Sequence, residues 1–484
     1  LEPDRSYRSI LNRYPSQRVH NWNLVGSSGE FLRYRLGFAV DNSFAERHLP
    51  LHISRMTLHG MYVDPHNPLA YDLFSRYHLL LMLINGYDGP GREEAEEFSR
   101  RGAWTSLFMQ SPCGEVPCGY RSSHHQWNEA LECAVFEIYA KHFAETGRPE
   151  ISGAFKRGAH LALESVRRWL RPSGELWIVK NRHDPGERWG YEGYSFHSQY
   201  NLLAASMLAM AFLNANDRIK ERPAPSDVGG FCFSLKDGKI EDIEADGFHK
   251  TFANCGGNYL EIERAGTLSY EPTGLVRLHR RSGQSALRGI SNGSVNSAHY
   301  GKTGWSDADM PFTHSICPGW LGQDGKWHKL ADLGEKEILG RSSVKVLKER
   351  PELVEFIITY DIRQQGCESI SSHYRLTAEK LTVSYELSGD IDQIRSYFTF
   401  LASDGQSSAE VEVDKSSLST VINGVRQTFR IVEPKNRVQL VTSLPGAEGR
   451  SWVESPFRDG TLGAVAFEAR GRTLTFEVFL TQYN

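Results

Sequence analysis

The spacing of apolar residues changes once along this chain. From about residue 30 to residue 216 they recur every three to four positions, and loops rich in Gly, Pro, Trp and His separate the recurring stretches. A period near 3.6 residues predicts helices that each bury one face. We expect helices, arranged as antiparallel hairpins, over residues 69–82, 92–109, 128–144, 154–170 and 195–214.

A different pattern follows the Pro-rich segment that ends this stretch. Short segments such as residues 354–360 and 381–387 alternate apolar and polar positions, with turn residues between them. A period of two predicts half-buried antiparallel strands. Helices followed by strands indicate two regions rather than a βαβ sheet. We therefore expect a helical domain at 1–222 and a large antiparallel β domain at 223–484.

Length and charge agree with this division. A chain of 484 residues exceeds what one hydrophobic core normally organises. The formal net charge of -4 gives no reason to expect binding to nucleic acid or to a membrane, although a local basic cleft can still attract an acidic substrate. No apolar run approaches the roughly 20 residues that span a bilayer. We expect a soluble protein.

Cysteine and histidine spacing argues against a catalytic metal. Neither Cys-x-x-Cys nor His-Glu-x-x-His is present. Seven cysteines are too scattered for a disulfide framework, and Cys113 and Cys118 are either free or a single small disulfide. The sequence leaves open whether the β half binds a structural ion. Its candidate ligands are His299, Asp307, Asp309 and His314.

Two loop-to-helix segments concentrate side chains suited to sugar chemistry. Residues 122–128 contain an adjacent histidine pair and a tryptophan, and residues 189–201 contain tyrosines, a histidine and a tryptophan. Histidine and tyrosine can exchange protons, and aromatic rings stack on sugars. The members are His124, His125, Trp127, Trp189, Tyr194, His197 and Tyr200. This pattern indicates acid-base chemistry on a carbohydrate.

The element order and the first of these segments resemble the toroid-plus-β-sandwich polysaccharide lyases, a group that includes heparinase II/III-like enzymes and several alginate lyases. In that group a loop before a helix supplies an Asn-His pair followed by an aromatic residue. His124-His125 with Trp127 is similar, except that His replaces Asn. The resemblance implies an incomplete (α/α) toroid of helical hairpins followed by a large antiparallel β-sandwich.

Further segments are also similar to that group. A later family segment reads Glu-Gly followed by Tyr or His, as does Glu192-Gly193-Tyr194 with His197 here, and Asn21-Trp22 is similar to an early Asn-Trp segment. The sandwich of toroid lyases often lends a Tyr or His to the cleft, for which we expect Tyr300 or His299. Some of these sandwich domains carry a zinc or calcium ion, so the resemblance implies at most such a structural ion and no organic cofactor.

The chemistry implied by the resemblance is β-elimination at a uronic acid. A base removes the proton from C5, other groups neutralise the carboxylate, and an acid protonates the departing O4. The expected roles are His125 or Tyr194 as base, Tyr200 or His197 as acid, and His124 with Arg121 as carboxylate neutralisers. A tyrosine base needs a pKa lowered by neighbouring cations, which Arg121, His124 and Arg188 are close enough in sequence to supply.

Every candidate also has a structural explanation. Histidines and tyrosines on helices often serve packing, tryptophans can fill the centre of a toroid, and Glu192 is expected to cap the helix that follows it. The expected substrate-binding residues are Asn21, Trp22, Arg121, Trp127, Arg188, Trp189, His299 and Tyr300.

Two other functions compete with a lyase. A glycoside hydrolase needs two carboxylates across the scissile bond, and a glycan-binding protein needs only the aromatic cleft. The available carboxylates are Glu30, Glu129, Asp184 and Glu192. We expect an acidic polysaccharide or oligosaccharide as substrate and a periplasmic or extracellular location. Residue types alone leave open which uronate is cleaved, whether action is endo or exo, and the oligomeric state.

Overall fold

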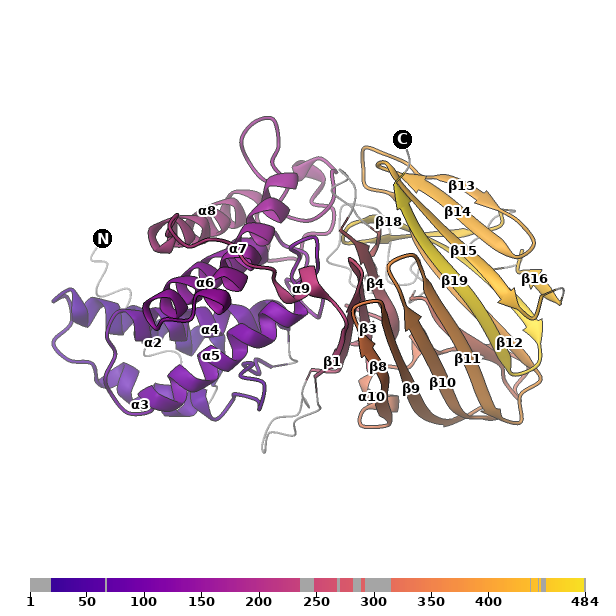
Figure 1. Ribbon diagram of the computed structural model, residues 1–484, viewed down its shortest axis with the longest axis horizontal. Coiled ribbons are helices and arrows are strands. Elements are labelled where there is room, and N and C mark those ends of the chain that lie inside the picture. Colours follow the sequence, from indigo (N-terminus) through magenta and orange to yellow (C-terminus); the bar gives the residue numbers. More distant parts are fainter. Residues whose placement is uncertain are drawn as a thin grey trace.

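The computed structural model describes residues 19–65, 68–235, 248–267, 270–281, 289–291, 315–435, 437–442, 444 and 450–482. His299 and Tyr300, the residues expected from the β half, lie outside the described residues, as do Asp307, Asp309 and His314. Figure 1 shows the helices on one side of the molecule and the strands on the other.

The helical region contains the expected helices and adds two before them. Its long helices are α2 (Asn21–Arg35), α3 (Ser43–Ile53), α4 (Leu69–Ile84), α5 (Arg92–Met109), α6 (Trp127–Glu145), α7 (Pro149–Arg168) and α8 (His197–Asn214). Helix α6 is central, because it packs against both α7 and α8 and is buried without interruption from Trp127 to Ala140. Its first turn therefore brings the preceding loop into the interior.

In the β region, all described pairings between the strands are antiparallel. Its strands are β1 (Phe231–Ser234), β2 (Lys250–Cys255), β3 (Asn258–Glu263), β4 (Gly274–Arg280), β5 (Gly289–Ser291), β6 (Cys317–Leu321), β7 (Trp327–Lys329), β8 (Ser342–Arg350), β9 (Leu353–Gln364), β10 (Cys367–Leu376), β11 (Leu381–Gly389), β12 (Gln393–Ser403), β13 (Glu410–Val413), β14 (Ser417–Ile422), β15 (Val425–Glu433), β16 (Val438–Leu440), β17 (Val453–Phe457), β18 (Gly460–Arg470) and β19 (Thr473–Gln482). Short helical turns occur at η1 (Pro185–Glu187), α9 (Pro225–Val228), η3 (Leu330–Asp332) and α10 (Glu335–Ile338).

Two of the sheets form a sandwich. One has the order β13-β14-β15-β19-β11-β10-β9-β8 and the other β16-β18-β12-β6-β7, with β17 also paired to β18. Phe398 of β12 contacts Phe429 of β15 and Phe476 of β19, each at 4.8 Å between ring centroids, so the two sheets share one core. Strand β9 alternates buried and half-buried positions as expected.

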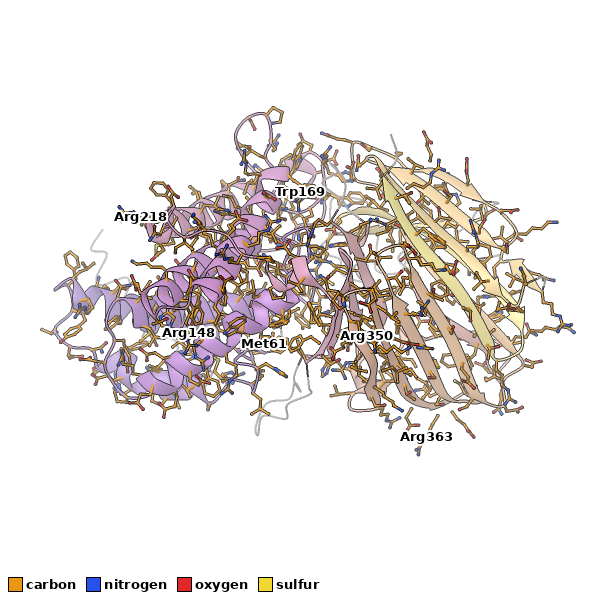
Figure 2. All side chains as sticks on the ribbon, in the orientation of Figure 1. Met61, Arg148, Trp169, Arg218, Arg350 and Arg363 are labelled. Atoms are coloured by element: carbon orange, nitrogen blue, oxygen red, sulfur yellow. The ribbon has the colours of Figure 1, made fainter. Side chains whose placement is uncertain are left out.

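A third sheet, β1-β2-β3-β4-β5, lies where the two regions meet (Figure 1). Strands β2 and β3 are buried at every position. Apolar clusters cross the junction: Met61 and Met109 pack with Phe252, and Trp169 packs with Phe457. Figure 2 labels Met61 and Trp169 on the side of the helical region that faces the strands. The expected order, helical hairpins followed by a large antiparallel β-sandwich, is confirmed. The change from helix to strand falls between α8 and β1, and the division at 222/223 lies in that segment.

Candidate active site at the junction of the two regions

The loop before α6 has a strained backbone. Tyr120, Ser122 and His124 have φ values of 60°, 59° and 68°, the left-handed region that residues with a Cβ rarely adopt. Each such residue costs of order 1 kcal/mol or more and persists only where its surroundings hold it. Residues kept in this conformation cluster at functional sites, so we take this loop, residues 120–125, as the centre of the candidate site.

Glu192 holds the middle of the loop. Its buried carboxylate accepts the Ser122 backbone N–H at 2.5 Å and the Ser122 hydroxyl at 2.9 Å. Burial alone would raise the pKa of Glu192, but His125, Arg458 and these hydrogen bonds lower it. The expectation that Glu192 caps the next helix was wrong, because the N-cap of α8 is Phe196 and no side chain caps it. Sequence reasoning thus missed its role in the loop.

Tyr194 is the exposed member of this cluster. It is 44% exposed, and its hydroxyl lies 2.7 Å from Ser122 Oγ. The single Ser122 proton is donated to Glu192, so Tyr194 donates to Ser122. Burial of the hydroxyl and the Glu192 carboxylate raise the pKa of Tyr194 well above its ordinary value. The expected lowering of its pKa by nearby cations is therefore wrong.

His125 is fully enclosed. Its Nδ1 lies 3.2 Å from the Ser122 carbonyl and its Nε2 lies 3.1 Å from Ser195 Oγ. The ring stacks on Tyr200 with centroids 4.8 Å apart. A carbonyl only accepts, so Nδ1 carries the proton and Nε2 accepts from Ser195. Burial lowers the pKa of His125. Both nitrogens are committed to the protein.

His124 points toward the β region. Its Nδ1 lies 2.8 Å and 3.0 Å from the two carboxylate oxygens of Asp459, and Arg277 Nη2 is 3.5 Å from the same nitrogen. Burial lowers the pKa of His124 to about 4, although Asp459 acts in the opposite direction. Asp459 follows β17 and was not foreseen, because an Arg-Asp-Gly turn looks like any other turn in the sequence.

Arg458 fastens the loop from the same turn. Its Nη1 donates to the carbonyl of Tyr120 at 2.8 Å and to Ser123 Oγ at 2.5 Å. Its guanidinium also lies 5.0 Å from the ring centre of Tyr270. The Trp189 indole donates to the carbonyls of Phe457 and Gly460, at 2.9 and 3.0 Å. The β17–β18 turn thus contacts both expected segments at once.

A cation lies on the outer side of the loop. Arg121 is partly exposed, pairs with Asp64, and stacks over the Tyr71 ring at 4.9 Å. Asn21 donates to both carboxylate oxygens of Asp64, at 2.8 and 2.9 Å. Trp22 follows Asn21 and is 61% exposed. The structure therefore brings together Asn21 and Arg121, with Trp22 in the adjacent position.

Other expected residues lie away from the exposed part of this cluster. His197 contacts Tyr191 at 3.1 Å and Glu175 at 3.0 Å instead. Trp127 is buried against Phe74 and Tyr200, so a sugar cannot reach it as a stacking surface without rearrangement. Arg188 donates to backbone carbonyls of residues 192, 193 and 195 and so braces their loop.

A network of buried ion pairs adjoins the candidate site. Lys180 contacts Glu115 at 3.0 Å and Glu129 at 2.7 Å, and Arg277 lies 3.7 Å from Glu261. Lys250 continues the network through three more contacts. Its partners are Glu261, Glu263 and Glu271, at 3.2, 2.8 and 2.8 Å. Burial raises the pKa of Glu263 to about 7, although Lys250 opposes this. No local sequence signal distinguishes these buried charges from surface ones.

The carboxylates expected for a hydrolase are dispersed. Glu129 is committed to Lys180, Glu30 lies 3.1 Å from Arg33 on α2, and Asp184 caps the short turn η1. Only Glu192 of the four belongs to the loop cluster. Two carboxylates facing one another across a cleft are therefore not found among those four residues.

None of the cysteines forms a disulfide, so the small Cys113–Cys118 disulfide, one of the two alternatives considered, is not formed. Cys113 Sγ donates to the Arg280 carbonyl at 3.4 Å and Cys118 Sγ to Glu261 at 3.0 Å, and all seven are unpaired with one another. Within the described residues no group of three His, Cys, Asp or Glu side chains is arranged to hold a metal ion. Among the helices in the described ranges, none is long and apolar enough to cross a membrane.

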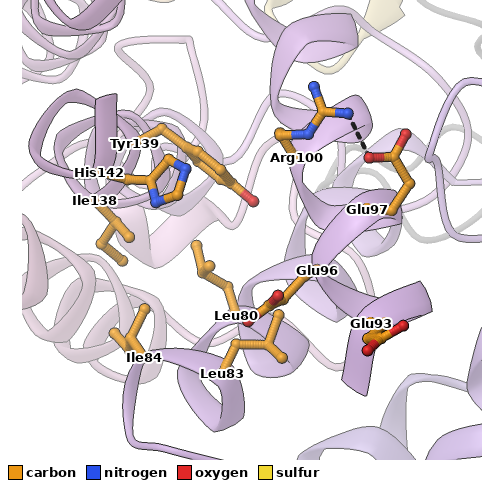
Figure 3. Close-up of a pocket in the computed structure, with 10 residues that line it drawn as sticks. All are labelled: Leu80, Leu83, Ile84, Glu93, Glu96, Glu97, Arg100, Ile138, Tyr139 and His142. Atoms are coloured by element: carbon orange, nitrogen blue, oxygen red, sulfur yellow. Dashed lines mark hydrogen bonds and ion pairs between the residues drawn. The ribbon is translucent and has the colours of Figure 1, made fainter. Parts of the chain in front are cut away.

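A separate pocket of about 450 Å³ lies between α4, α5 and α6 (Figure 3). Glu93, Glu96 and Glu97 line it together with apolar side chains such as Leu80 and Leu83. Glu97 forms an ion pair with Arg100 at its edge. Glu96 is paired with Arg92, and Glu97 is also paired with Arg101, so arginines balance two of the three carboxylates.

The described residues form a helical region followed by antiparallel sheets, and the candidate site lies where the two regions meet. The sequence matches no family model and no curated protein. Among solved structures, the chain is similar to heparinase III, with 10% identity, 99% of this chain and 73% of that chain covered, and a TM-score of 0.42.

Two further solved structures show a similar likeness. Heparan sulfate lyase HepC from Pedobacter heparinus has 9% identity, with 95% of this chain and 68% of that chain covered and a TM-score of 0.40. Chondroitin AC lyase from Streptomyces coelicolor A3 has 9% identity, with 98% of this chain and 62% of that chain covered and a TM-score of 0.45. At these identities the likeness concerns the fold alone.

Proposed function

We propose that this protein is a polysaccharide lyase that cleaves a uronate-containing glycan by β-elimination and leaves a 4,5-unsaturated uronate. One observation carries the proposal. The Tyr194 side chain is 44% exposed, its hydroxyl is held by Ser122 in the strained loop, and Arg121 in the same loop is partly exposed. A proton carrier and a cation for a carboxylate are the two groups that this reaction needs at the substrate.

Tyr194 suits the acid role. Its raised pKa keeps the phenol protonated at neutral pH, so it does not serve as a phenolate base. The departing O4 is a strong base once the C4–O4 bond breaks, and a protonated phenol beside it can donate. This reverses one of the expected alternatives, in which Tyr194 takes the C5 proton.

Arg121 is suited to bind the uronate carboxylate. Its guanidinium is stacked over Tyr71 and oriented by Asp64, which limits its motion before substrate binds. Trp22 offers an exposed ring next to Asn21 for a neighbouring sugar. The substrate is accordingly an acidic polysaccharide, and because such polymers do not cross a membrane unaided, we place the protein in the periplasm or outside the cell.

The test is ultraviolet absorbance during incubation with glucuronan, glycosaminoglycans, alginate and a rhamnose-glucuronate gum. The unsaturated uronate absorbs, whereas a hydrolysis product does not. We expect absorbance to rise on one of them, and Tyr194→Phe to lower kcat by about 100-fold or more, as for loss of a general acid. Tyr34→Phe, in the exposed part of α2, is the control and retains full turnover.

Two results would contradict the proposal. New reducing ends without absorbance would show hydrolysis. Full turnover by a folded Tyr194→Phe variant would remove Tyr194 from the mechanism.

A further inference from the structure

The β17–β18 turn reaches the strained loop with a carboxylate. Asp459 is fully buried, and it contacts His124 Nδ1 across 335 residues of sequence. The turn has little freedom: a Cβ on Gly460 would lie 2.0 Å from the Ser403 carbonyl, and Gly460 has φ 133°. Asp459 is therefore presented to His124 by a fixed backbone.

The contact determines which nitrogen of His124 carries the proton. An ionised carboxylate only accepts, so Nδ1 donates to Asp459 and the lone pair is on Nε2. The other charged groups facing the ring are Arg277, 3.5 Å from Nδ1, and Arg458 of the same turn. These cations disfavour a charged imidazolium before substrate arrives. In the described part of the chain, Nε2 forms no hydrogen bond.

We propose that Asp459 is a positioning residue that keeps His124 in the Nδ1–H form, so that Nε2 can take the C5 proton of the glycan. This inference rests on the proposed function. The C5–H bond breaks as Nε2 binds the proton, its electron pair forms the C4=C5 double bond, and the C4–O4 bond breaks as Tyr194 protonates O4. The imidazolium proton afterwards returns the Tyr194 phenolate to its neutral state through solvent.

His124 fits this role better than His125. His125 has its two nitrogens bound to Ser122 and Ser195, whereas His124 uses only Nδ1. The negative Asp459 can also stabilise the imidazolium that forms during the reaction, as a buried acid does for a catalytic histidine in other enzymes. The β region would in this way control a base that belongs to the helical region.

The experiment combines nitrogen-15 NMR of histidine-labelled protein with steady-state kinetics. His124→Gln assigns the His124 signals. We expect the wild-type ring to show the Nδ1–H form, and Asp459→Asn to shift it toward Nε2–H. The same variant should lose at least about 10-fold in kcat with KM nearly unchanged, because the loss is in proton transfer and not in binding.

Asp404→Asn is the matched control. Asp404 is an equally buried carboxylate of the β region, and its Oδ1 accepts backbone N–H groups of Gln406 and Ser407 instead of a histidine. The Asp404→Asn variant should leave both the His124 tautomer and kcat unchanged. The inference is overturned by an Nε2–H ring in the wild type, or by equal kcat values for Asp459→Asn and Asp404→Asn.

The two readouts separate this inference from the proposed function. The tautomer is measured on the wild-type protein, with His124→Gln used only to assign its signals, and no substrate has to be known. A protein that cleaves no uronate glycan yet shows the Nδ1–H form would contradict the proposed function while supporting the positioning contact. Elimination activity in a protein whose His124 ring is in the Nε2–H form would support the proposed function and contradict the positioning contact.

Discussion

Glu192 and Ser122, 70 residues apart in sequence, are joined by two hydrogen bonds, one from the Ser122 backbone and one from its hydroxyl. Ser122 has a left-handed backbone, and in this conformation its N–H donates to the Glu192 carboxylate. The conformation of the loop at the candidate site is thus stabilised by a side chain from the second expected segment.

Replacing Glu192 should destabilise the protein. In Glu192→Ala the buried N–H and hydroxyl of Ser122 lose their acceptor, and we expect the free energy of unfolding to fall by about 2–4 kcal/mol. Glu192→Gln should cost less, because its amide oxygen still accepts one bond. Urea unfolding measures both. Glu187→Ala, on the exposed turn nearby, is the comparison, and an equally small effect of all three would refute the role of Glu192.

Arg121 should control substrate binding. If it binds the uronate carboxylate, Arg121→Gln removes a charged hydrogen bond and raises KM by about 10-fold or more, with a smaller change in kcat. Asp64 would lose its ion pair and keep only its hydrogen bonds from Asn21, so the double variant Arg121→Gln/Asp64→Asn is needed to separate binding from stability. Arg92→Gln, on the exposed side of α5, should leave KM unchanged. An unchanged KM for Arg121→Gln would exclude it from binding.

Buried histidines should make stability depend on pH. His52 is fully buried, and burial together with His48, Arg55 and His20 lowers its pKa to about 3. The unfolded chain takes up this proton near its ordinary pKa of about 6.5. Between pH 6.5 and 3 the unfolded state therefore binds more protons. The free energy of unfolding should fall by about 1.4 kcal/mol per pH unit for each such group as pH decreases.

The contribution of His52 can be isolated. His52→Asn should reduce the slope of unfolding free energy against pH between 6 and 4, measured by urea unfolding at each pH. Tyr62→Phe removes the hydroxyl that lies 2.8 Å from His52 Nδ1 and leaves the titrating ring in place, so the slope should persist. A wild-type slope in His52→Asn would contradict the assignment.

The junction should not tolerate a larger residue at Gly190. A Cβ there would lie 2.4 Å from the Arg458 carbonyl, on a backbone with φ 74°. Gly190→Ala should therefore displace the β17–β18 turn and destabilise the fold by about 1–3 kcal/mol beyond the backbone strain. Gly174→Ala has the same kind of strain, with φ 90° and nothing within 4 Å of a Cβ. Equal melting temperatures for the two variants would show that the close approach is unimportant.

Periodicity predicted the helices and strands because each element buries one face. It placed the start of α8 two residues too early, because the helix was predicted from residue 195 and begins at His197. The reason is local: Arg188 donates to the carbonyls of residues 193 and 195, and Phe196 is extended, with φ -120° and ψ 139°. Tyr194 consequently lies in the loop that precedes the helix.

Residue types predicted the two segments that meet at the candidate site, but not the tertiary contacts that hold these segments in place. Asp459 and Arg458 belong to a turn that gave no functional pattern, and Glu192 was interpreted as a cap. Tertiary contacts between residues 335 positions apart leave no trace in local spacing. The sequence therefore indicated where proton carriers gather, whereas their protonation states depend on partners that only the fold brings close.

The turn at Phe457–Gly460 also has a consequence for the order of synthesis. The ribosome completes the 120–125 loop and α6 long before it makes Arg458 and Asp459, which are the partners of Tyr120, Ser123 and His124. Until then the carbonyls of that loop lack Arg458, and Trp169, which later packs against Phe457, lacks that ring. The conformation of the 120–125 loop can therefore be completed only after most of the β strands have been made, whereas the helices themselves are formed from earlier residues.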